Sequence, residues 1–440
     1  MINVLIISGF LANLAAYGNF YSTLFFITIW GISNLTIIFC FSGREKNTAK
    51  ELSILIICLM YFFSGMIEIM IVQGFNPVGS DAFNYFRMAS DAQWDFRNFI
   101  SEGLSSGFLS DNVTGLKEDF LPILIWNKFY NLFYSIGFPK GRYIGLASNT
   151  LFLVWTSFIG LSILRSIKVL NNNTSEKYYK LLFCTNTIFW MYGSILLRES
   201  IIVFIISILL KVWIDWIHKK SFFNLIKLGI ISTSFYFIGD FLRGGYQNIL
   251  FIFIVSFLIL EIYKIILERR INYIHFVLLI LIVSFCLVRY QNIFEIFETV
   301  KERFTTYKYY SSVETDVGSF GAVLIGQPVL IRTLLSGFFL LISPIPFWAG
   351  QENSFSFYHF YKSTFAIYNY FTIPLLAIVI KESIKKLRKL EPEKLFLLSL
   401  LIQIILFIGL TSTDTRHFGN FGIIYILLIC YVDFNSSVVK

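Results

Sequence analysis

The stretch "GSILLRESIIVFIISILL", residues 193–210, places an arginine and a glutamate between two apolar runs. A charged side chain at the centre of a bilayer costs about 3 kcal/mol even on the more lenient scales. The apolar residues on either side extend these runs toward the length that crosses the hydrocarbon core. Arg198 and Glu199 therefore mark either a short turn at a membrane surface or a working site just inside it.

The composition of the whole chain sets its class. The protein has 440 residues, of which 56% are hydrophobic and only 14% are charged, and its mean hydropathy is +0.70. A soluble protein of this length could not hide so much apolar surface, and the alternating strands of a membrane barrel are absent from the sequence. The sequence predicts an all-α polytopic membrane protein with a single integral membrane domain, residues 1–440.

Apolar runs predict about twelve transmembrane helices. They lie near residues 3–17, 20–41, 52–73, 142–164, 181–197, 200–217, 226–239, 246–264, 273–289, 365–381, 395–412 and 418–434. The first run lacks the basic residues that precede a cleavable signal, so we expect it to be retained as a span.

Basic residues predict the orientation of these spans. Five short loops and the final Lys440 together hold 21 of the 36 lysines and arginines. Short loops rich in Lys and Arg stay on the cytoplasmic side. The five loops can share that side only if both termini are also cytoplasmic. The formal net charge of +9 therefore reflects topology, and we expect no nucleic-acid partner.

The same topology leaves two larger loops on the outer face. The first, residues 74–141, includes an aromatic, amphipathic segment that suits a helix lying on the membrane surface. The second, residues 290–364, ends in the apolar stretch 332–364, which contains Pro344 and Pro346. Proline breaks a helix, so we interpret this stretch as a re-entrant or interfacial segment whose backbone is buried in protein.

Charged residues gather at the outer ends of the predicted spans. They are Asp81, Arg198, Glu199, Asp240, Arg243, Arg332, Asp414, Arg416 and His417. Guanidinium groups bind phosphate oxygens bidentately and stay charged at all relevant pH values. Several arginines facing one cavity would bind a polyanion such as a lipid pyrophosphate and would stabilise charge on it as it departs. A carboxylate or His417 could take a proton from an attacking hydroxyl.

Structural explanations exist for each of these residues. An arginine at the end of a span often reaches to the interface as an anchor, which applies best to Arg332. Glu199 could only neutralise its neighbour, Asp81 could cap the next helix, and His417 could cap or pack. Aromatic residues suit sugar faces, and Tyr85 and Tyr246 are our candidates, but most aromatics in the chain fit an interfacial belt.

The sequence resembles the Wzy-type polymerases of bacterial O-antigen and related surface polysaccharides. The resemblance rests on "VGSDAFNYF" in the first outer loop, "LLRES" between two mid-chain spans and "FLRGGYQ" one hairpin later. "SPIPFW" before the last spans and the closing "DTRHFGNFG" also fit, so the resemblance covers nearly the whole chain as architecture.

The resemblance implies a metal-independent glycosyltransferase of the bacterial cytoplasmic (inner) membrane, without a cofactor, acting in lipopolysaccharide biosynthesis. It would move a growing glycan from undecaprenyl pyrophosphate to a new lipid-linked repeat unit at the outer face, with a chain-length regulator protein as partner. The implied catalytic residues are Asp81, Arg198, Arg243, Arg416 and His417. The implied substrate-binding residues are Tyr85, Glu199, Asp240, Tyr246, Arg332 and Asp414.

Two other functions are compatible with parts of the sequence. An O-antigen ligase, or another lipid-linked glycosyltransferase, would use a similar site but deliver the glycan to a different acceptor. A flippase for lipid-linked repeat units would need charges along a central pathway and repeated halves. The charges here concentrate at one face and no repeat is visible, which favours the polymerase.

Overall fold

The structure, a computed structural model, describes part of the chain. The described residues are 11, 20–75, 80–91, 116–167, 173–243, 246–268, 327, 329–342, 357–386, 390–411 and 415–431. Helices and short connections account for these residues, and none of them is assigned to a strand. Seven of the helices are long and apolar enough to cross a membrane. The chain is therefore a helical, polytopic membrane protein, as its composition predicts.

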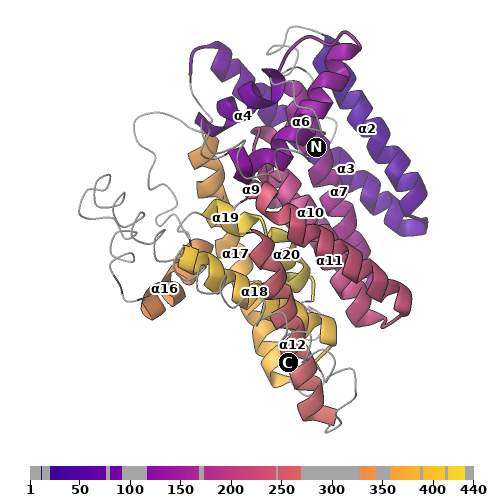
Figure 1. Ribbon diagram of the computed structural model, residues 1–440, viewed down its shortest axis with the longest axis vertical. Helices are drawn as coiled ribbons and strands as arrows, with labels where there is room; N and C mark the ends of the chain where they lie inside the picture. Colours follow the sequence, from indigo (N-terminus) through magenta and orange to yellow (C-terminus); the bar gives the residue numbers. More distant parts are fainter. Residues whose placement is uncertain are drawn as a thin grey trace.

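The helices form one elongated bundle (Figure 1). The longer ones are α2 (Phe20–Cys40), α3 (Gly43–Val72), α6 (Leu116–Ser135), α7 (Tyr143–Ser166), α10 (Glu199–His218), α11 (Phe222–Leu242), α12 (Ile249–Glu268), α17 (Phe357–Lys385) and α18 (Pro392–Thr411). The shorter ones are α4 (Ser80–Asp91), α8 (Asn173–Thr185), α9 (Thr187–Ser194), η2 (Tyr246–Asn248), α16 (Val329–Ile342), α19 (Thr415–Gly419) and α20 (Gly422–Ile429).

Helix α7 lies at the centre of the bundle and packs against α10, α3, α2 and α9. It is apolar on all sides, and almost all of its membrane-spanning length is buried. A helix of that kind needs neighbours all round. By contrast, α2 and α11 present many exposed apolar side chains, such as Phe39 and Phe237, to the outside. Such faces suit the lipid around a membrane bundle.

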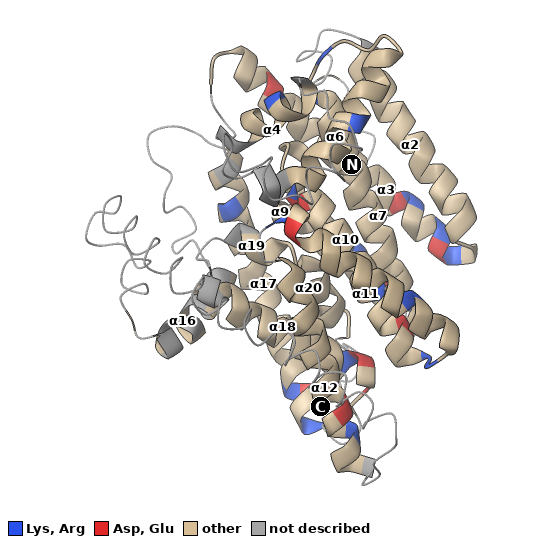
Figure 2. Ribbon diagram, in the orientation of Figure 1, with Lys and Arg blue, Asp and Glu red and all other residues tan. Residues whose placement is uncertain are grey.

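One end of the bundle is held together by ion pairs between loops, and we call it the basic face. Figure 2 shows charged residues near the ends of helices, with long uncharged stretches between them. The pairs are Arg44–Glu176, Arg165–Glu45, Lys180–Glu51, His218–Glu393 and Lys220–Glu261. They join α3 to α8 and to the end of α7, and they join the end of α10 and the residue Lys220 after it to α18 and α12. The basic loops therefore lie on one face of the bundle, as the sequence predicts. The cytoplasmic location of this face stays a prediction.

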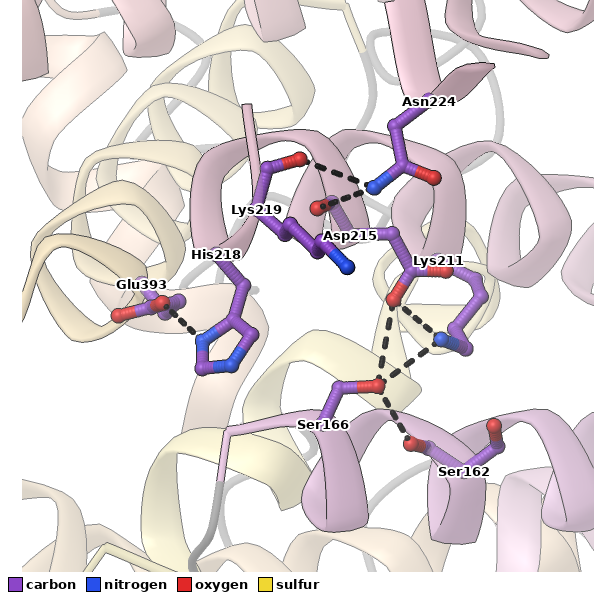
Figure 3. Close-up of polar contacts among 8 residues, drawn as sticks. All are labelled: Ser162, Ser166, Lys211, Asp215, His218, Lys219, Asn224 and Glu393. Atoms are coloured by element: carbon purple, nitrogen blue, oxygen red, sulfur yellow. Dashed lines mark hydrogen bonds and ion pairs between the residues drawn. The ribbon is translucent and has the colours of Figure 1, made fainter. Parts of the chain in front are cut away.

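The end of α10 at the basic face, residues 211–219, is connected on two sides, and we call it the α10 foot (Figure 3). Lys211 pairs with Asp215 one turn later, and both contact the Ser166 hydroxyl of α7, at 3.0 Å and 3.2 Å. On the other side, His218 Nδ1 lies 2.9 Å from Glu393 Oε1 of α18. The α10 foot is thus tied to α7 and α18, and Asn224 of α11 also donates to its Asp215 and Lys219 carbonyls.

Three predicted boundaries differ from the structure. Residues 181–197 do not form one span, because α8 and α9 meet at a break at Asn186, whose side chain caps α9 by accepting from the Ile188 amide. The last span is likewise interrupted between α19 and α20. Helix α17 begins at Phe357, so the final residues of the predicted re-entrant segment 332–364 belong to a span.

Several predicted features lie mostly or wholly outside the described residues. These are the spans 3–17 and 273–289, much of the outer loops 74–141 and 290–364, and the proline-containing part of the re-entrant segment. Within the first loop, α6 buries Trp126 and Tyr130 completely against the bundle. Whether this helix also lies along a membrane surface stays a prediction.

Candidate functional site

The chain between α9 and α10 leaves the helical conformation inside the bundle. Ile195 has extended backbone angles, φ −115° and ψ 139°, and it is buried together with Leu196 and Leu197. Helix α10 then begins at Glu199, with Arg198 in the capping position before it. The arginine–glutamate pair thus follows a buried break and does not sit in a solvent-exposed turn.

A buried asparagine satisfies the backbone of this break. Asn149 of α7 donates from Nδ2 to the carbonyl oxygens of Tyr192 at 3.1 Å, Leu197 at 3.0 Å and Ile195 at 3.5 Å. Its Oδ1 accepts from the indole N–H of Trp126 in α6 at 2.9 Å. Carbonyls that leave a helix in an apolar environment need such partners. Asn149 therefore lowers the free-energy cost of the break before Arg198 by giving its carbonyl oxygens hydrogen-bond donors.

Arg243 is held by a close approach of two backbone segments. It ends α11 in an extended conformation, φ −172° and ψ 138°, and its carbonyl accepts from the Tyr246 amide at 3.0 Å. The chain of η2 passes directly over Gly239 of α11. A Cβ atom at that position would lie 2.7 Å from the Gln247 nitrogen, so only glycine allows this approach. This approach places η2, with Tyr246, against the end of α11, where Arg243 lies.

A third segment, α19 with the break between α19 and α20, also reaches Arg243 and Tyr246. Asn420 lies in this break, is completely buried and donates from Nδ2 to the Tyr246 hydroxyl at 2.5 Å. Three residues earlier, His417 Nε2 lies 2.9 Å from an amino nitrogen of Arg243. The C-terminal segment thus contacts the end of α11 at two points.

We call the resulting group of side chains the arginine cluster: Arg198, Glu199, Arg243, Tyr246, His417 and Asn420. Arg243 is its centre, with one amino nitrogen 3.8 Å from Glu199 Oε1 and the guanidinium 5.8 Å from the centre of the Tyr246 ring. Arg198 and Glu199 both lie within electrostatic range of the Tyr246 hydroxyl. The segments that meet here are far apart in sequence.

Burial strengthens the ionic interactions within the cluster. The side chain of Glu199 is 1% exposed and that of Arg243 is 16% exposed. Away from water, ionic interactions are much stronger than at a surface, and an uncompensated charge is much more costly. The cluster contains two guanidinium groups, and Arg243 faces the carboxylate of Glu199. Guanidinium groups bind phosphate oxygens, so a phosphate-bearing ligand is the kind that this cluster suits.

The length of α10 places the cluster across the bundle from the basic face. Its 20 residues extend for about 30 Å at 1.5 Å per residue, which matches the thickness of the hydrocarbon core. The α10 foot is at the basic face and Glu199 is at the other end. Glu199 also occupies the first turn of α10, where the helix dipole stabilises a negative charge.

The remaining predicted site residues are not brought into this cluster by described contacts. Tyr85 in α4 is buried, with its ring 5.6 Å from that of Trp126, which is a packing arrangement. Asp240 is half-buried in the last turn of α11. The side chains of Asp81, Arg332 and Arg416 lie outside the described part of the structure, as does Asp414 entirely. Their predicted roles stay predictions.

Sequence reasoning missed Asn149, Asn420 and a second buried ion pair. Arg142, before α7, binds Glu68 of α3 at 2.7 Å, and its guanidinium lies 4.8 Å from the centre of the Phe83 ring of α4. An available signal was the presence of asparagine and glutamate within apolar runs, since polar residues inside membrane segments usually have a specific partner.

The described residues contain no group of three histidine, cysteine, aspartate or glutamate side chains close enough to hold a metal ion. Comparison of the chain with protein-family models, with curated proteins and with solved structures finds no match. Within the described residues, the arginine cluster is the feature that indicates a function, through the chemistry it suits.

Proposed function

We propose that the protein is a Wzy-type polysaccharide polymerase of the bacterial inner membrane. It would join undecaprenyl-pyrophosphate-linked oligosaccharide repeat units into O-antigen or a related surface polysaccharide at the outer face. The observation that carries the proposal is the buried arginine cluster at the end of the membrane bundle opposite the basic face. A lipid-linked pyrophosphate would reach this depth with its charged group level with the helix ends.

The proposed reaction is a glycosyl transfer. A hydroxyl oxygen of the acceptor sugar attacks the anomeric carbon of the donor glycan and breaks the bond from that carbon to the pyrophosphate oxygen. The hydroxyl proton passes to a base, and undecaprenyl pyrophosphate leaves with the electron pair. Arg198 and Arg243 would bind the departing pyrophosphate and stabilise its growing negative charge, which lowers the barrier more than it strengthens ground-state binding.

The hydrogen bonds suggest different roles for His417 and Glu199. Arginine can only donate, so His417 Nε2 accepts from Arg243 and its lone pair is engaged. His417 would then orient Arg243. Glu199 also faces Arg243, through Oε1 at 3.8 Å, but its carboxylate has a second oxygen, which makes it the better candidate for the proton acceptor. Tyr246 and Asn420 would hold Arg243 in place from the other side.

Deletion of the gene in its host tests the proposal, with lipopolysaccharide analysed by gel. A polymerase deletion should leave core carrying a single repeat unit, without the ladder of longer chains. Restoring the gene as Arg198→Ala or Arg243→Ala, at normal protein level, should give the same pattern. Arg→Lys at each position should recover little, because lysine does not offer bidentate geometry. Lys227→Ala, at an exposed position on α11, is the matched control and should restore the ladder.

Other patterns would contradict the polymerase. Bare core after deletion would refute it and point to a ligase or a flippase. Lipid-linked polymer accumulated at the outer face would then identify the ligase, and its absence would identify the flippase. A normal ladder after deletion would exclude all three functions, provided that no second gene of the same kind is present.

A further inference from the structure

Asn149 connects two parts of the molecule that the proposed function treats separately. One is α6, within the predicted first outer loop, residues 74–141, which reaches Asn149 through the Trp126 indole. The other is the break at residues 195–198, which it holds through three carbonyl oxygens. Asn149 is completely buried, so no water competes for these bonds. Its four contacts use both donor hydrogens and the acceptor of the amide.

The break controls where the first charged residues of α10 lie. Leu197, whose carbonyl accepts from Asn149, directly precedes Arg198, and the Arg198 carbonyl accepts from the Ile201 and Ile202 amides. The position of the break thus sets the first turn of α10. A shift of the break by a fraction of an ångström would shift Arg198 and Glu199 by a similar amount.

We infer that Asn149 is the positioning residue for Arg198 and Glu199, and that Trp126 makes the geometry of the arginine cluster depend on α6. The inference rests on the anion-binding part of the proposed function for its effect on ligand, but not for its effect on the backbone. Asn149 contacts none of the charged groups in the cluster, so it would act only through the break. Misplacement of a binding group by about 1 Å commonly costs up to about 100-fold in function.

The chain offers a matched control for Asn149. Asn127 in α6 is also completely buried, and its Nδ2 donates to a backbone carbonyl, that of Ala89 in α4, at 2.9 Å. Asn127→Leu leaves the Ala89 carbonyl without this donor, whereas Asn149→Leu removes the partner of three buried carbonyls and of the Trp126 N–H at the break before Arg198. A general loss of stability should therefore affect both variants along the chain, whereas loss of positioning should be larger for Asn149→Leu at residues 195–203.

The test uses the purified full chain in lipid nanodiscs and two measurements. Hydrogen exchange is followed for amides in residues 195–203, and affinity is measured for inorganic pyrophosphate by calorimetry. Asn149→Leu should speed exchange in this segment and weaken pyrophosphate binding by roughly 10-fold to 100-fold. Trp126→Phe, a milder change, should do both to a smaller extent. Asn149→Gln keeps the amide and should recover part of the affinity, and Asn127→Leu, which keeps the Trp126 indole, should change both quantities less than Asn149→Leu does.

The outcomes separate the two proposals. Unchanged exchange at residues 195–203 in both Asn149→Leu and Trp126→Phe would overturn the positioning role, whatever the ligand does. If exchange changes as expected but the wild-type chain does not bind pyrophosphate, the positioning role stands and the proposed function loses its anion site. If Asn149→Leu does not fold, Trp126→Phe compared with Asn127→Leu decides the question by the same criteria.

Discussion

The ion pair between Glu199 and Arg243 should be among the strongest couplings between side chains in this protein. The amino nitrogen and the carboxylate oxygen are 3.8 Å apart, and the Glu199 side chain is 1% exposed. At an effective dielectric of about 20, two unit charges at that distance attract by about 4 kcal/mol. Arg243 keeps 16% of its surface exposed, and solvent screening reduces the attraction. We therefore expect a coupling free energy of about 2–3 kcal/mol.

A double-mutant cycle measures this coupling. The free energy of unfolding is determined for the wild type, Glu199→Gln, Arg243→Ala and the double variant, in mixed micelles of a mild detergent and SDS. Each single change should destabilise the protein by about 3 kcal/mol, because it leaves a buried charge without its partner. The double change should cost less than the sum of the two, since the second loss removes the stranded charge.

An exposed pair in the same chain supplies the control. The side chains of Lys180 and Glu51 are 28% and 50% exposed, and pairs of this kind are worth about 0–1 kcal/mol. Glu51→Gln should therefore have little effect. A coupling below about 0.5 kcal/mol between Glu199 and Arg243 would refute the reasoning, because it would mean that water reaches the cluster and screens it as it does a surface pair.

Three further predictions concern stability. Gly239→Ala should cost about 2–4 kcal/mol in free energy of unfolding, because its Cβ would lie 2.7 Å from the Gln247 nitrogen, and a cost under about 0.5 kcal/mol would contradict the close approach. Gln403→Leu removes a hydrogen bond at 2.7 Å from α18 to Ser256 of α12 and should cost about 0.6–2 kcal/mol, measured in the same micelles. Burial lowers the pKa of Lys394, so the folded state loses this charge at a lower pH than the unfolded state does. The free energy of unfolding should therefore rise with pH up to the ordinary lysine pKa of about 10.4, and Lys394→Met should flatten that rise.

Hydropathy predicted the long spans because burial in lipid or protein requires apolar residues along a whole helix. It placed α2, α7, α10 and α12 within a few residues of their observed bounds. Hydropathy could not reveal the breaks at Asn186 and Asn420, since a few unwound residues change a window average very little. Whether a break is tolerated depends on partners elsewhere, such as Asn149, and a single sequence does not give those contacts.

The candidate site was predicted in part for a topological reason. Helices that cross a membrane alternate in direction, so the predicted spans, with 332–364 re-entrant, put the turns with Arg198, Arg243 and His417 on one face. Their meeting in one cluster depends on features that composition hides, chiefly the approach at Gly239 and the contact from Asn420 to Tyr246. The chemical roles of these residues are proposals, because residue types and distances constrain a reaction without identifying its substrate.

The α10 foot has a mechanical consequence for the far end of its helix. Because α10 is about 30 Å long, a rigid-body tilt of about 2° around the foot moves its other end by about 1 Å. Ser166 of α7 and Glu393 of α18, which contact the foot together with Asn224 of α11, should therefore help to fix the tilt of α10 and with it the position of Arg198. Substitutions at either residue should appear in a functional screen as defects of the opposite membrane face, although neither side chain comes near it.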